Sequence, residues 1–328
     1  MKRVIAFLLP LALLISAATA TAVNAASNYD LQRLLLGTSS AGGTYYVLGA
    51  GWSNIINKSL KNIDITCEVT PGPTTNMQLI EKGEMDLGMV TAWLAGEAVT
   101  GTGWAAKSGA YKNFQSLFPT HNSYLYIFTL KDKGINTVYD LAGKHIAIGP
   151  VGSTSDVAGR AVLETLGIKP AKISRLPSDA MISSIKDGTI DAAFGVTGSP
   201  APWLLDLQTT HKVKLIEPAD GDFAKILKAY PFWGVDEIPA KVYKDQSEPY
   251  KAVSFWNFVV IRKGIREDVA YDLVKTTFDN YKDFLLVDKS AEGVKTVNVP
   301  KMTVPLHPGA LKYYKEMGVD IPSSLIAK

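Results

Sequence analysis

Two short stretches of the chain share one pattern and decide the fold: Lys82-Gly83-Glu84-Met85-Asp86-Leu87, and Asp187-Gly188-Thr189-Ile190-Asp191-Ala192. In each stretch a glycine ends a helical segment. An aspartate then follows within an apolar run that is typical of a buried strand. The repetition indicates two α/β units of similar construction in one chain.

The sequence around each stretch extends the parallel between the two units. The first unit predicts strands at 34–37, 63–69 and 85–90, with helices at 45–58 and from Thr74 or Thr75 to Lys82. The second predicts strands at 145–148 and 190–194, with helices at 156–166 and 178–186. Strand–loop–helix–strand units of this kind build parallel sheets with right-handed crossovers. Ligands of such sheets bind beyond the carboxyl ends of the strands.

Two further runs rich in β-formers, 124–130 and 253–261, each end at a basic turn that contains glycine. We expect them to form two hinge crossings between the units. A helical stretch at 266–284 and a last helix after Pro308 complete the pattern. The predicted fold is therefore α/β with two lobes, each a mostly parallel sheet flanked by helices. Residues 26–129 and 246–328 form the first lobe, and residues 130–245 form the second.

The N-terminus has the layout of a secretory signal peptide. Lys2 and Arg3 precede an apolar run at 4–18, and small residues follow up to Ala25. The run is short for a membrane anchor of about 20 residues. We expect cleavage after residue 25 and a periplasmic protein. The formal net charge then falls from +3 to +1, because Lys2 and Arg3 leave with the signal peptide.

The composition, 47% hydrophobic and 20% charged, is that of a globular protein. No known catalytic motif stands out, and the four histidines are too widely spaced for a metal site. The single cysteine, Cys67, excludes an internal disulfide. No basic run indicates a nucleic-acid partner. We therefore expect a non-enzyme without metal or cofactor.

Five uncharged loops fall where a ligand of the two units would bind: 39–44, 70–76, 91–96, 149–155 and 195–205. They offer hydroxyls, Asn76, Trp93, Trp203 and two predicted helix N-termini, at Thr44 and at 153–154. Unpaired N–H groups at a helix N-terminus bind an anion without a basic side chain. The alternative is that these Ser and Thr residues are ordinary helix caps and the tryptophans fill the core.

A set of segments then adds a family resemblance. They are Gly-Gly-Thr-Tyr-Tyr at 42–46, the stretch 82–87, Asp-Leu-Ala-Gly-Lys-His-Ile-Ala-Ile-Gly at 140–149, Gly-Ser-Thr at 152–154, the stretch 187–194, Gly-Ser-Pro at 198–200, and Pro-Leu-His-Pro-Gly-Ala-Leu-Lys-Tyr-Tyr-Lys-Glu at 305–316. Together they resemble the TAXI-type solute-binding proteins of TRAP transporters, which have the type II periplasmic-binding fold.

The resemblance implies a periplasmic receptor, active as a monomer, that closes on a small organic acid and delivers it to an ion-gradient-driven TRAP membrane permease. The acid would be a dicarboxylate, a 2-oxo acid or an amino acid such as glutamate. The resemblance and the loops together predict these ligand residues: Thr44, Tyr45, Asn76, Thr91, Trp93, Gly152, Ser153, Thr154, Gly198 and Ser199.

One departure from the family bears on the ligand. Relatives often have polar or acidic residues after the strand that ends here at Val90, where this chain has Thr91-Ala92-Trp93. This favours a carboxylate without an α-amino group, with an apolar part against Trp93. Two alternatives stay open: a binding protein of the same fold that serves an ABC importer or a sensor kinase, and a secreted hydrolase.

Overall fold

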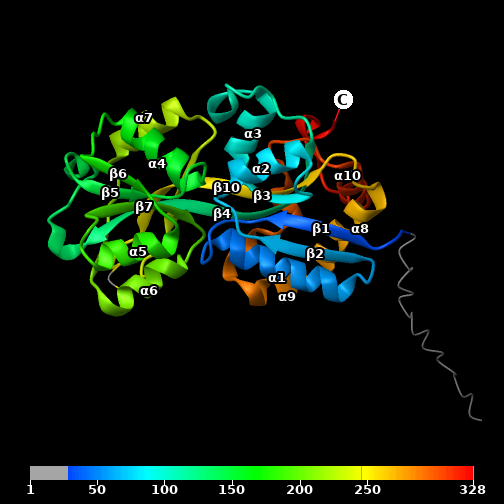
Figure 1. The fold of residues 1–328 in the computed structure, drawn as a ribbon, viewed down its shortest axis with the longest axis horizontal. Helices are drawn as coiled ribbons and strands as arrows, with labels where there is room; N and C mark the ends of the chain where they lie inside the picture. Colours follow the sequence, from blue (N-terminus) through cyan, green and yellow to red (C-terminus); the bar gives the residue numbers. More distant parts are fainter. Residues whose placement is uncertain (1–28, 245, 328) are drawn as a thin grey trace, which may run out of the picture.

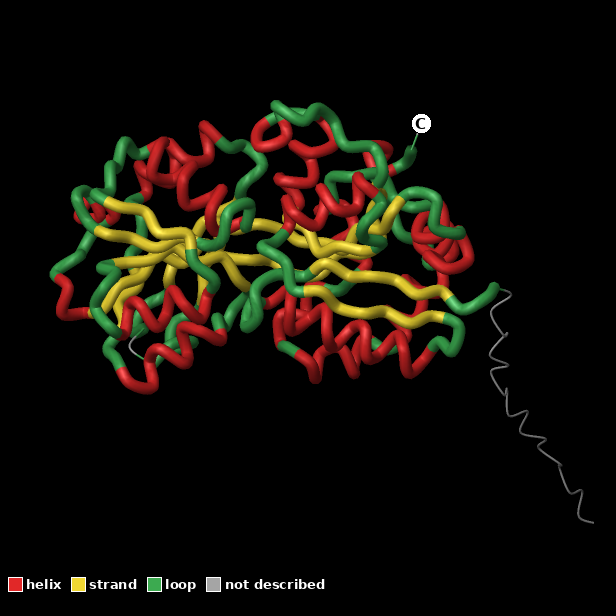
Figure 2. The backbone as a smooth tube through the Cα atoms, viewed as in Figure 1, coloured by secondary structure: helices red, strands yellow, loops and turns green. Residues whose placement is uncertain are grey.

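The computed structural model describes residues 29–244 and 246–327, so the predicted signal peptide, 1–25, lies outside the described residues. The described strands form one sheet, shown in Figure 1 and, by secondary structure, in Figure 2. They are β1 (Gln32–Gly37), β2 (Ile63–Glu68), β3 (Leu87–Thr91), β4 (Phe114–Leu130), β5 (His145–Ile148), β6 (Lys172–Arg175), β7 (Ala192–Thr197), β8 (Val213–Leu215), β9 (Gly234–Ile238) and β10 (Tyr250–Arg262).

The strand order shows the repetition expected from the sequence. The sheet runs β2-β1-β3-β10-β4-β7-β5-β6, with β8 paired to β4 and β9 to β10. The triplet β2-β1-β3 thus has the same internal order as β6-β5-β7, and the strands of each triplet are parallel. We call the first triplet with its helices the first lobe and the second the second lobe.

The described helices flank the sheet on both faces. They are α1 (Thr44–Ser59), α2 (Pro73–Lys82), α3 (Ala92–Thr100), α4 (Thr154–Thr165), α5 (Ser178–Lys186), α6 (Pro202–Thr210), α7 (Asp220–Ala229), α8 (Glu267–Asp279), α9 (Tyr281–Val287) and α10 (Pro308–Glu316). Figure 1 shows α2, α3, α4 and α7 on one face, and α1, α9, α5 and α6 on the other. The C-terminal helices α8 and α9 return to pack on α1 of the first lobe.

The strands β4 and β10 connect the lobes, as predicted. β4 pairs with β10 up to Tyr124 and with β7 from Tyr124 onward. β10 pairs with β9 of the second lobe up to Ser254, and then with β3 of the first. Both strands are longer than the predicted runs, because β4 begins at Phe114 and β10 at Tyr250. A bulge opposite Asn257 interrupts their pairing in the middle of the molecule.

The two aspartates of the repeated stretch have equivalent roles. Asp86 accepts a hydrogen bond from the backbone N–H of Leu35 in β1 (3.1 Å) and pairs with Arg262 (2.8 Å). Asp191 accepts from the N–H of His145 in β5 (3.0 Å), and its other oxygen lies 3.8 Å from Lys133. Each aspartate therefore links the start of the strand that follows it to the neighbouring parallel strand. Each also links it to the basic turn at the end of a hinge strand.

Two expectations about local structure were wrong. Residues 91–96 are not a loop, because α3 begins at Ala92 directly after β3 and buries its apolar first turn. Within 195–205, residues up to Thr197 extend β7, and α6 begins at Pro202. The stretch 266–284 is helical as predicted, and it consists of two helices, α8 and α9, that are separated at Asn280. In the described residues no helix has both the length and the apolar character needed to cross a membrane.

Candidate functional site

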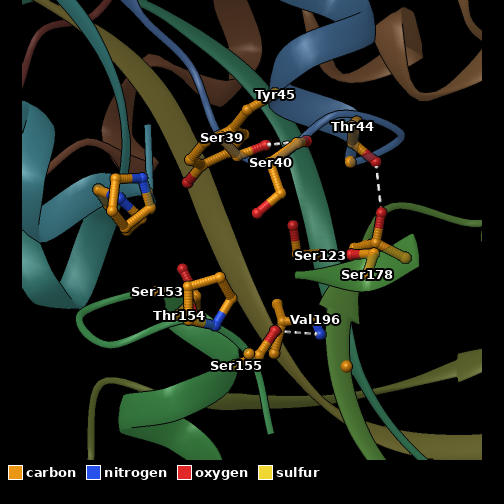
Figure 3. Close-up of a pocket in the computed structure, with 18 of the residues that line it drawn as sticks. Ser39, Ser40, Thr44, Tyr45, Ser123, Ser153, Thr154, Ser155, Ser178 and Val196 are labelled. Atoms are coloured by element: carbon orange, nitrogen blue, oxygen red, sulfur yellow. Dashed lines mark hydrogen bonds between the residues drawn. The ribbon is translucent and has the colours of Figure 1, made fainter. Parts of the chain in front are cut away.

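A cavity of about 60 Å³ lies between the lobes, beyond the carboxyl ends of β1, β5 and β7 (Figure 3). It is lined by Ser39, Ser40, Gly43, Thr44, Tyr45, Pro71, Gly72, Pro73, His121, Ser123, Gly149, Pro150, Ser153, Thr154, Ser155, Leu176, Ser178, Met181, Gly195, Val196, Thr197, Trp203 and Asn257. None of these residues is an Asp, Glu, Lys or Arg, while six are serines. Among the described residues, no group of three or more His, Cys, Asp or Glu is placed to bind a metal.

Four helices begin at this cavity. Residues at or next to the N-termini of α1, α2, α4 and α5 line it, namely Gly43–Thr44, Gly72–Pro73, Ser153–Thr154 and Ser178. Two of these helices belong to each lobe. The backbone N–H groups of a first helical turn are left without intrahelical partners and carry partial positive charge. The helix N-termini therefore direct partial positive charge at the cavity, whose lining has no Lys or Arg.

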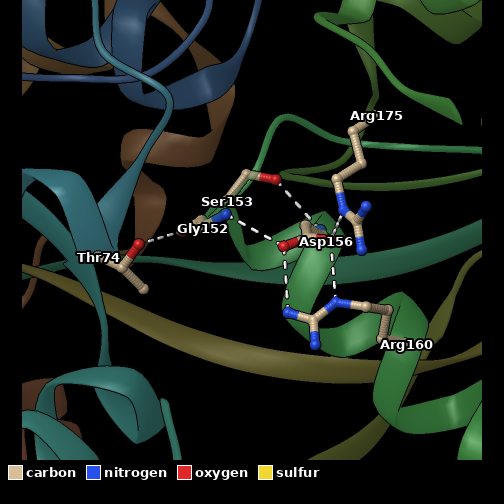
Figure 4. Close-up of polar contacts among 6 residues, drawn as sticks. All are labelled: Thr74, Gly152, Ser153, Asp156, Arg160 and Arg175. Carbon is tan, nitrogen blue, oxygen red and sulfur yellow. Dashed lines mark hydrogen bonds and ion pairs between the residues drawn. The ribbon is translucent and has the colours of Figure 1, made fainter. Parts of the chain in front are cut away.

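The second-lobe wall is held by Asp156, whose side chain is almost fully buried in the first turn of α4 (Figure 4). Its carboxylate accepts hydrogen bonds from the N–H of Gly152 (3.1 Å), from Arg160 (3.0 and 3.1 Å) and from Arg175 (2.9 Å). Its own N–H donates to the Oγ of the helix cap Ser153 (3.1 Å). Burial opposes ionisation, but these donors outweigh it and hold the pKa of Asp156 below its usual value.

The floor of the cavity is organised by Asn257 of β10, which lies opposite the bulge in β4. Its Nδ2 group donates to the carbonyls of His121 and Phe255 and to Ser123, which fixes Oδ1 as the acceptor. The hydroxyl of Tyr45 donates to that Oδ1 (2.5 Å). Burial raises the pKa of Tyr45, so its hydroxyl keeps its proton at neutral pH.

The direction of these bonds sets the role of two threonines. Because the Tyr45 proton is used by Asn257, Thr91 must donate to the Tyr45 oxygen (3.0 Å). Thr154 in turn donates to Thr91 (2.7 Å). The Thr154 proton therefore points across the cleft to the first lobe, and this hydroxyl is not a donor to a ligand in the closed form.

Other hydrogen bonds also cross the cleft. Thr44 of α1 bonds with the hydroxyl of Thr197 at the end of β7 (2.6 Å) and accepts from the N–H of Gly198 (3.0 Å). Thr74 of α2 donates to the carbonyl of Gly152 (2.7 Å). These contacts, together with Thr91–Thr154, join the strand ends and helix starts of opposite lobes around the cavity.

His121 is almost fully buried and lies edge-on to Tyr45, with ring centroids 5.8 Å apart. Burial lowers its pKa to about 3, so the imidazole is neutral at physiological pH. Its Nδ1 lies 3.2 Å from the hydroxyl of Thr120, and its Nε2 has no partner among the residues that the structure describes. The cavity histidine is therefore not paired with a serine.

The structure brings four of the predicted ligand residues to the cavity: Thr44, Tyr45, Ser153 and Thr154. The other six are not among the lining residues. Asn76 is buried, where its amide donates to the carbonyls of Gly37, Thr38 and Met89. Trp93 lies in a cluster of aromatic rings. Thr91, Gly152 and Gly198 make the bonds across the cleft, and Ser199 lines a separate groove.

Several lining residues were not singled out as ligand residues: Ser39, Ser40, His121, Ser123, Ser155, Ser178 and Asn257. Ser39, Ser40 and Ser155 lie within uncharged loops that the sequence did indicate. Ser178 begins a helix that was predicted at its observed position. His121, Ser123 and Asn257 belong to the hinge strands, and nothing in their local pattern distinguishes a cavity floor from an ordinary strand.

A family model matches residues 36–318, most of the chain, and describes the NMT1-like family. The chain belongs to the NMT1-like family. Solved structures with the same fold include the periplasmic binding protein BugD, with 14% identity, a TM-score of 0.55, and coverage of 90% of this chain and 100% of that chain. A structure described as a periplasmic transporter has 13% identity, a TM-score of 0.56, and coverage of 87% and 92%.

A protein from Bordetella bronchiseptica RB50 has 14% identity to this NMT1-like chain, a TM-score of 0.52, and coverage of 89% and 90%. At such identities the likeness shows the fold, and function has to be argued from the site itself. The likenesses confirm the predicted two-lobe fold of periplasmic binding proteins for this NMT1-like protein.

Proposed function

We propose that this NMT1-like protein is the periplasmic receptor of a TRAP-type transporter, and that it captures a small carboxylate between its lobes and delivers it to an ion-gradient-driven permease. The observation that carries the proposal is the cavity itself. Its lining is uncharged, rich in hydroxyls and faced by the N-termini of four helices. Such a site stabilises an anion through backbone dipoles and hydroxyl donors.

The lining also favours a carboxylate without an amino group. The α-ammonium group of an amino acid needs a carboxylate or several oxygen acceptors when it leaves water. No Asp or Glu lies among the described residues that line the cavity, and Asp156 behind α4 is already saturated by two arginines. A dicarboxylate or 2-oxo acid, which has no cationic group, fits this chemistry better than glutamate.

The size of the cavity gives the closing motion a role in ligand uptake. A cavity that holds benzene has a volume of roughly 150 Å³, and this one has about 60 Å³. A ligand of dicarboxylate size therefore enters while the lobes are apart. Ligand contacts to both lobes would then favour closure, because only differential contacts shift a conformational equilibrium.

We assign separate roles to the ten predicted residues and to two of the newly found serines. Thr44, Tyr45 and Ser153, with Ser40 and Ser178, face the ligand. Thr91, Thr154, Gly152 and Gly198 hold the lobes together, Trp93 packs between them, and Asn76 supports the first-lobe loops. Ser199 has no ligand role in this assignment.

Native mass spectrometry of freshly purified protein tests the proposal, followed by identification of any acid released on denaturation. Calorimetry with succinate, 2-oxoglutarate and glutamate then ranks the candidate classes. The variants Ser40→Ala and Ser178→Ala should each weaken binding of the preferred acid by about 10–150-fold, as expected for one lost hydrogen bond of about 1.5–3 kcal/mol to a charged group. Ser184→Ala, on the outer part of α5, is the matched control and should leave affinity unchanged. Equal affinity in all three variants would contradict the assignment.

The transport and localisation parts have their own tests. Sequencing the N-terminus of the protein from a periplasmic extract should begin at residue 26. Uptake that collapses with an ionophore, and not with ATP depletion alone, supports a TRAP permease as partner. The opposite dependence supports an ABC importer.

A further inference from the structure

Four aromatic residues, which we call the interlobe aromatic cluster, meet beside the hinge: Trp93, Tyr230, Trp233 and Phe255. Trp93 lies 5.1 Å from Trp233 and 6.5 Å from Tyr230, measured between ring centroids. Tyr230 stacks on Trp233 at 4.2 Å, and Phe255 contacts both indoles at 6.0 and 5.1 Å. None of the four lines the cavity.

The members of the cluster come from three different parts of the fold. Trp93 belongs to the first turn of α3 in the first lobe, two residues after Thr91. Tyr230 and Trp233 follow α7 and precede β9 in the second lobe. Phe255 belongs to the hinge strand β10. Figure 1 shows α3 and α7 on the same face of the sheet, on either side of the junction between the lobes.

The cluster makes both a favourable and an unfavourable contribution to the free energy of lobe closure. Trp93 and Trp233 are each only 6% exposed, so closure removes large apolar rings from water and makes ring contacts. Yet the indole N–H groups of both have no hydrogen-bond partner within 29–244 and 246–327, and neither nitrogen is accessible to solvent. A buried donor without a partner loses the bond that it makes to water when exposed.

We infer that the interlobe aromatic cluster positions the two walls of the ligand site. The two unpaired indole N–H groups limit how strongly the cluster stabilises the closed arrangement of the lobes. Ring packing between Trp93 and Trp233 fixes α3 and Thr91 against the second lobe. The unpaired indole N–H groups favour separation of the lobes, because they can then donate hydrogen bonds to water. They therefore keep closure reversible. The inference rests on the proposed function, since it assigns to these residues the closing step of ligand capture.

The two terms predict opposite effects for two substitutions at the same position. Alanine removes the ring packing, whereas phenylalanine retains most of it and removes the unpaired donor. Trp104 provides the matched control, because it lies within the first lobe and its N–H is satisfied by the carbonyl of Leu94 (2.9 Å).

Disulfide trapping measures closure without any ligand. In a background with Cys67→Ser, the pair Thr44→Cys and Thr197→Cys replaces two hydroxyls that lie 2.6 Å apart across the cleft. Since a disulfide needs Cβ atoms within about 4.5 Å, its rate of formation in the unliganded protein reports the closed population.

Trp93→Ala and Trp233→Ala should each slow trapping by about 10-fold, equivalent to ~1.4 kcal/mol of closure free energy. Trp93→Phe and Trp233→Phe should trap at the parent rate or faster, and Trp104→Phe at the parent rate. The inference is overturned if alanine leaves the rate unchanged, or if phenylalanine slows it as much as alanine does. Circular dichroism of each variant before trapping confirms that a slow rate does not reflect unfolding.

The trapping result is independent of the proposed ligand. If the wild-type protein, without the introduced cysteines, binds none of succinate, 2-oxoglutarate and glutamate while trapping follows the predicted order, the proposed function fails and the role of the cluster stands. If the acids bind but the trapping rates do not follow that order, the role of the cluster fails and the proposed function stands.

Discussion

The hydroxyls of Thr44 and Thr197 lie 2.6 Å apart across the cleft, and a second pair repeats this contact with the lobes exchanged. Thr44 is the first residue of α1, and Thr197 is the last residue of β7. Thr154, the first residue of α4, bonds in the same way with Thr91, the last residue of β3 (2.7 Å). The repeated order of the strands thus produces a reciprocal pair of threonine contacts, one on each side of the pseudo-symmetric site.

The Thr91–Thr154 pair should contribute to ligand binding through closure. We predict that Thr154→Val weakens binding of the preferred acid by ~5–10-fold, because it removes one hydrogen bond of about 1 kcal/mol. Thr91→Val removes the same bond and also the bond to Tyr45 (3.0 Å), so it should weaken binding at least as much, and the double variant no more than Thr91→Val alone. A double-mutant cycle by calorimetry checks this. Thr100→Val, at the exposed end of α3, is the control. Strictly additive losses in the double variant would show that the two hydroxyls act separately.

Gly152 offers a steric test of closure. Its φ is +80°, and a Cβ there would lie 2.2 Å from the Oγ1 of Thr74 in the opposite lobe. Gly152→Ala should therefore keep the lobes apart and weaken acid binding by at least about 10-fold. Gly143→Ala is the matched control, with a φ of +71° and nothing within 4 Å of the added carbon. Both variants should lose about 1 kcal/mol of stability from the strained backbone, and only Gly152→Ala should lose affinity.

Asp156 should be needed for the stability of the second-lobe wall. Replacing it with asparagine leaves Arg160 and Arg175 without their shared carboxylate and should lower the free energy of unfolding by about 2 kcal/mol at pH 7. Because the folded-state pKa of Asp156 is depressed, its contribution is present above the unfolded pKa near ~3.9 and is lost as pH falls through the folded value.

Urea unfolding from pH 7 to pH 3 measures this difference. The difference in free energy of unfolding between the wild type and Asp156→Asn should become smaller below about pH 4. Asp179→Asn, in the exposed first turn of α5, controls for the loss of a negative charge at a helix N-terminus. A difference in free energy of unfolding that stays constant from pH 7 to pH 3 would mean that the charge of Asp156 is not what stabilises the second-lobe wall.

The sequence predicted most elements of the fold that are repeated, with β6 as the exception, and much less of what lies between the repeats. The aspartates Asp86 and Asp191 identified two equivalent units because each makes the same local contact to a neighbouring strand. By contrast, the uncharged residues after Thr91 predict a loop, whereas the structure has helix α3 there. No turn separates strand β3 from α3, so the sequence lacks the usual signal for the start of a helix. Helix α7 and strands β8 and β9 were not predicted, because short elements of mixed polarity have weak periodicity.

For the candidate site, the sequence indicated loops that line the cavity but not the direction of their side chains. Thr44, Tyr45, Ser153 and Thr154 were found because they begin helices after a strand. Asn76 lies in an equally uncharged segment, yet its amide is buried on three backbone carbonyls of the first lobe. Which loop residue faces the ligand depends on the packing of the lobes, and no single-sequence pattern carries that information.

His121 should make the protein sensitive to moderate acid. Its folded pKa of about 3 is below that of an unfolded histidine, so stability is full above the unfolded pKa near ~6.5 and falls as pH drops from there toward the folded value. We predict that the wild type loses about 2 kcal/mol between pH 7 and pH 4.5 through this group.

His121→Phe should reduce that loss, because the ring still packs on Tyr45 and no longer takes up a proton on unfolding. Urea unfolding at pH 7 and pH 4.5 makes the comparison. His211→Phe, at the end of α6, is the control and should leave the pH dependence as in the wild type. An unchanged pH dependence in His121→Phe would refute the prediction.

The central claim, that an uncharged cavity selects an anion through helix N-termini and hydroxyls, is tested most directly by calorimetry with three ligands of one length. These are succinate, its neutral diamide and 1,4-diaminobutane. We predict that the dianion binds, that the diamide binds at least about 100-fold more weakly because it lacks charge-assisted hydrogen bonds, and that the diamine does not bind. Binding of the diamide as tight as that of succinate, or a preference for the diamine, would contradict the account.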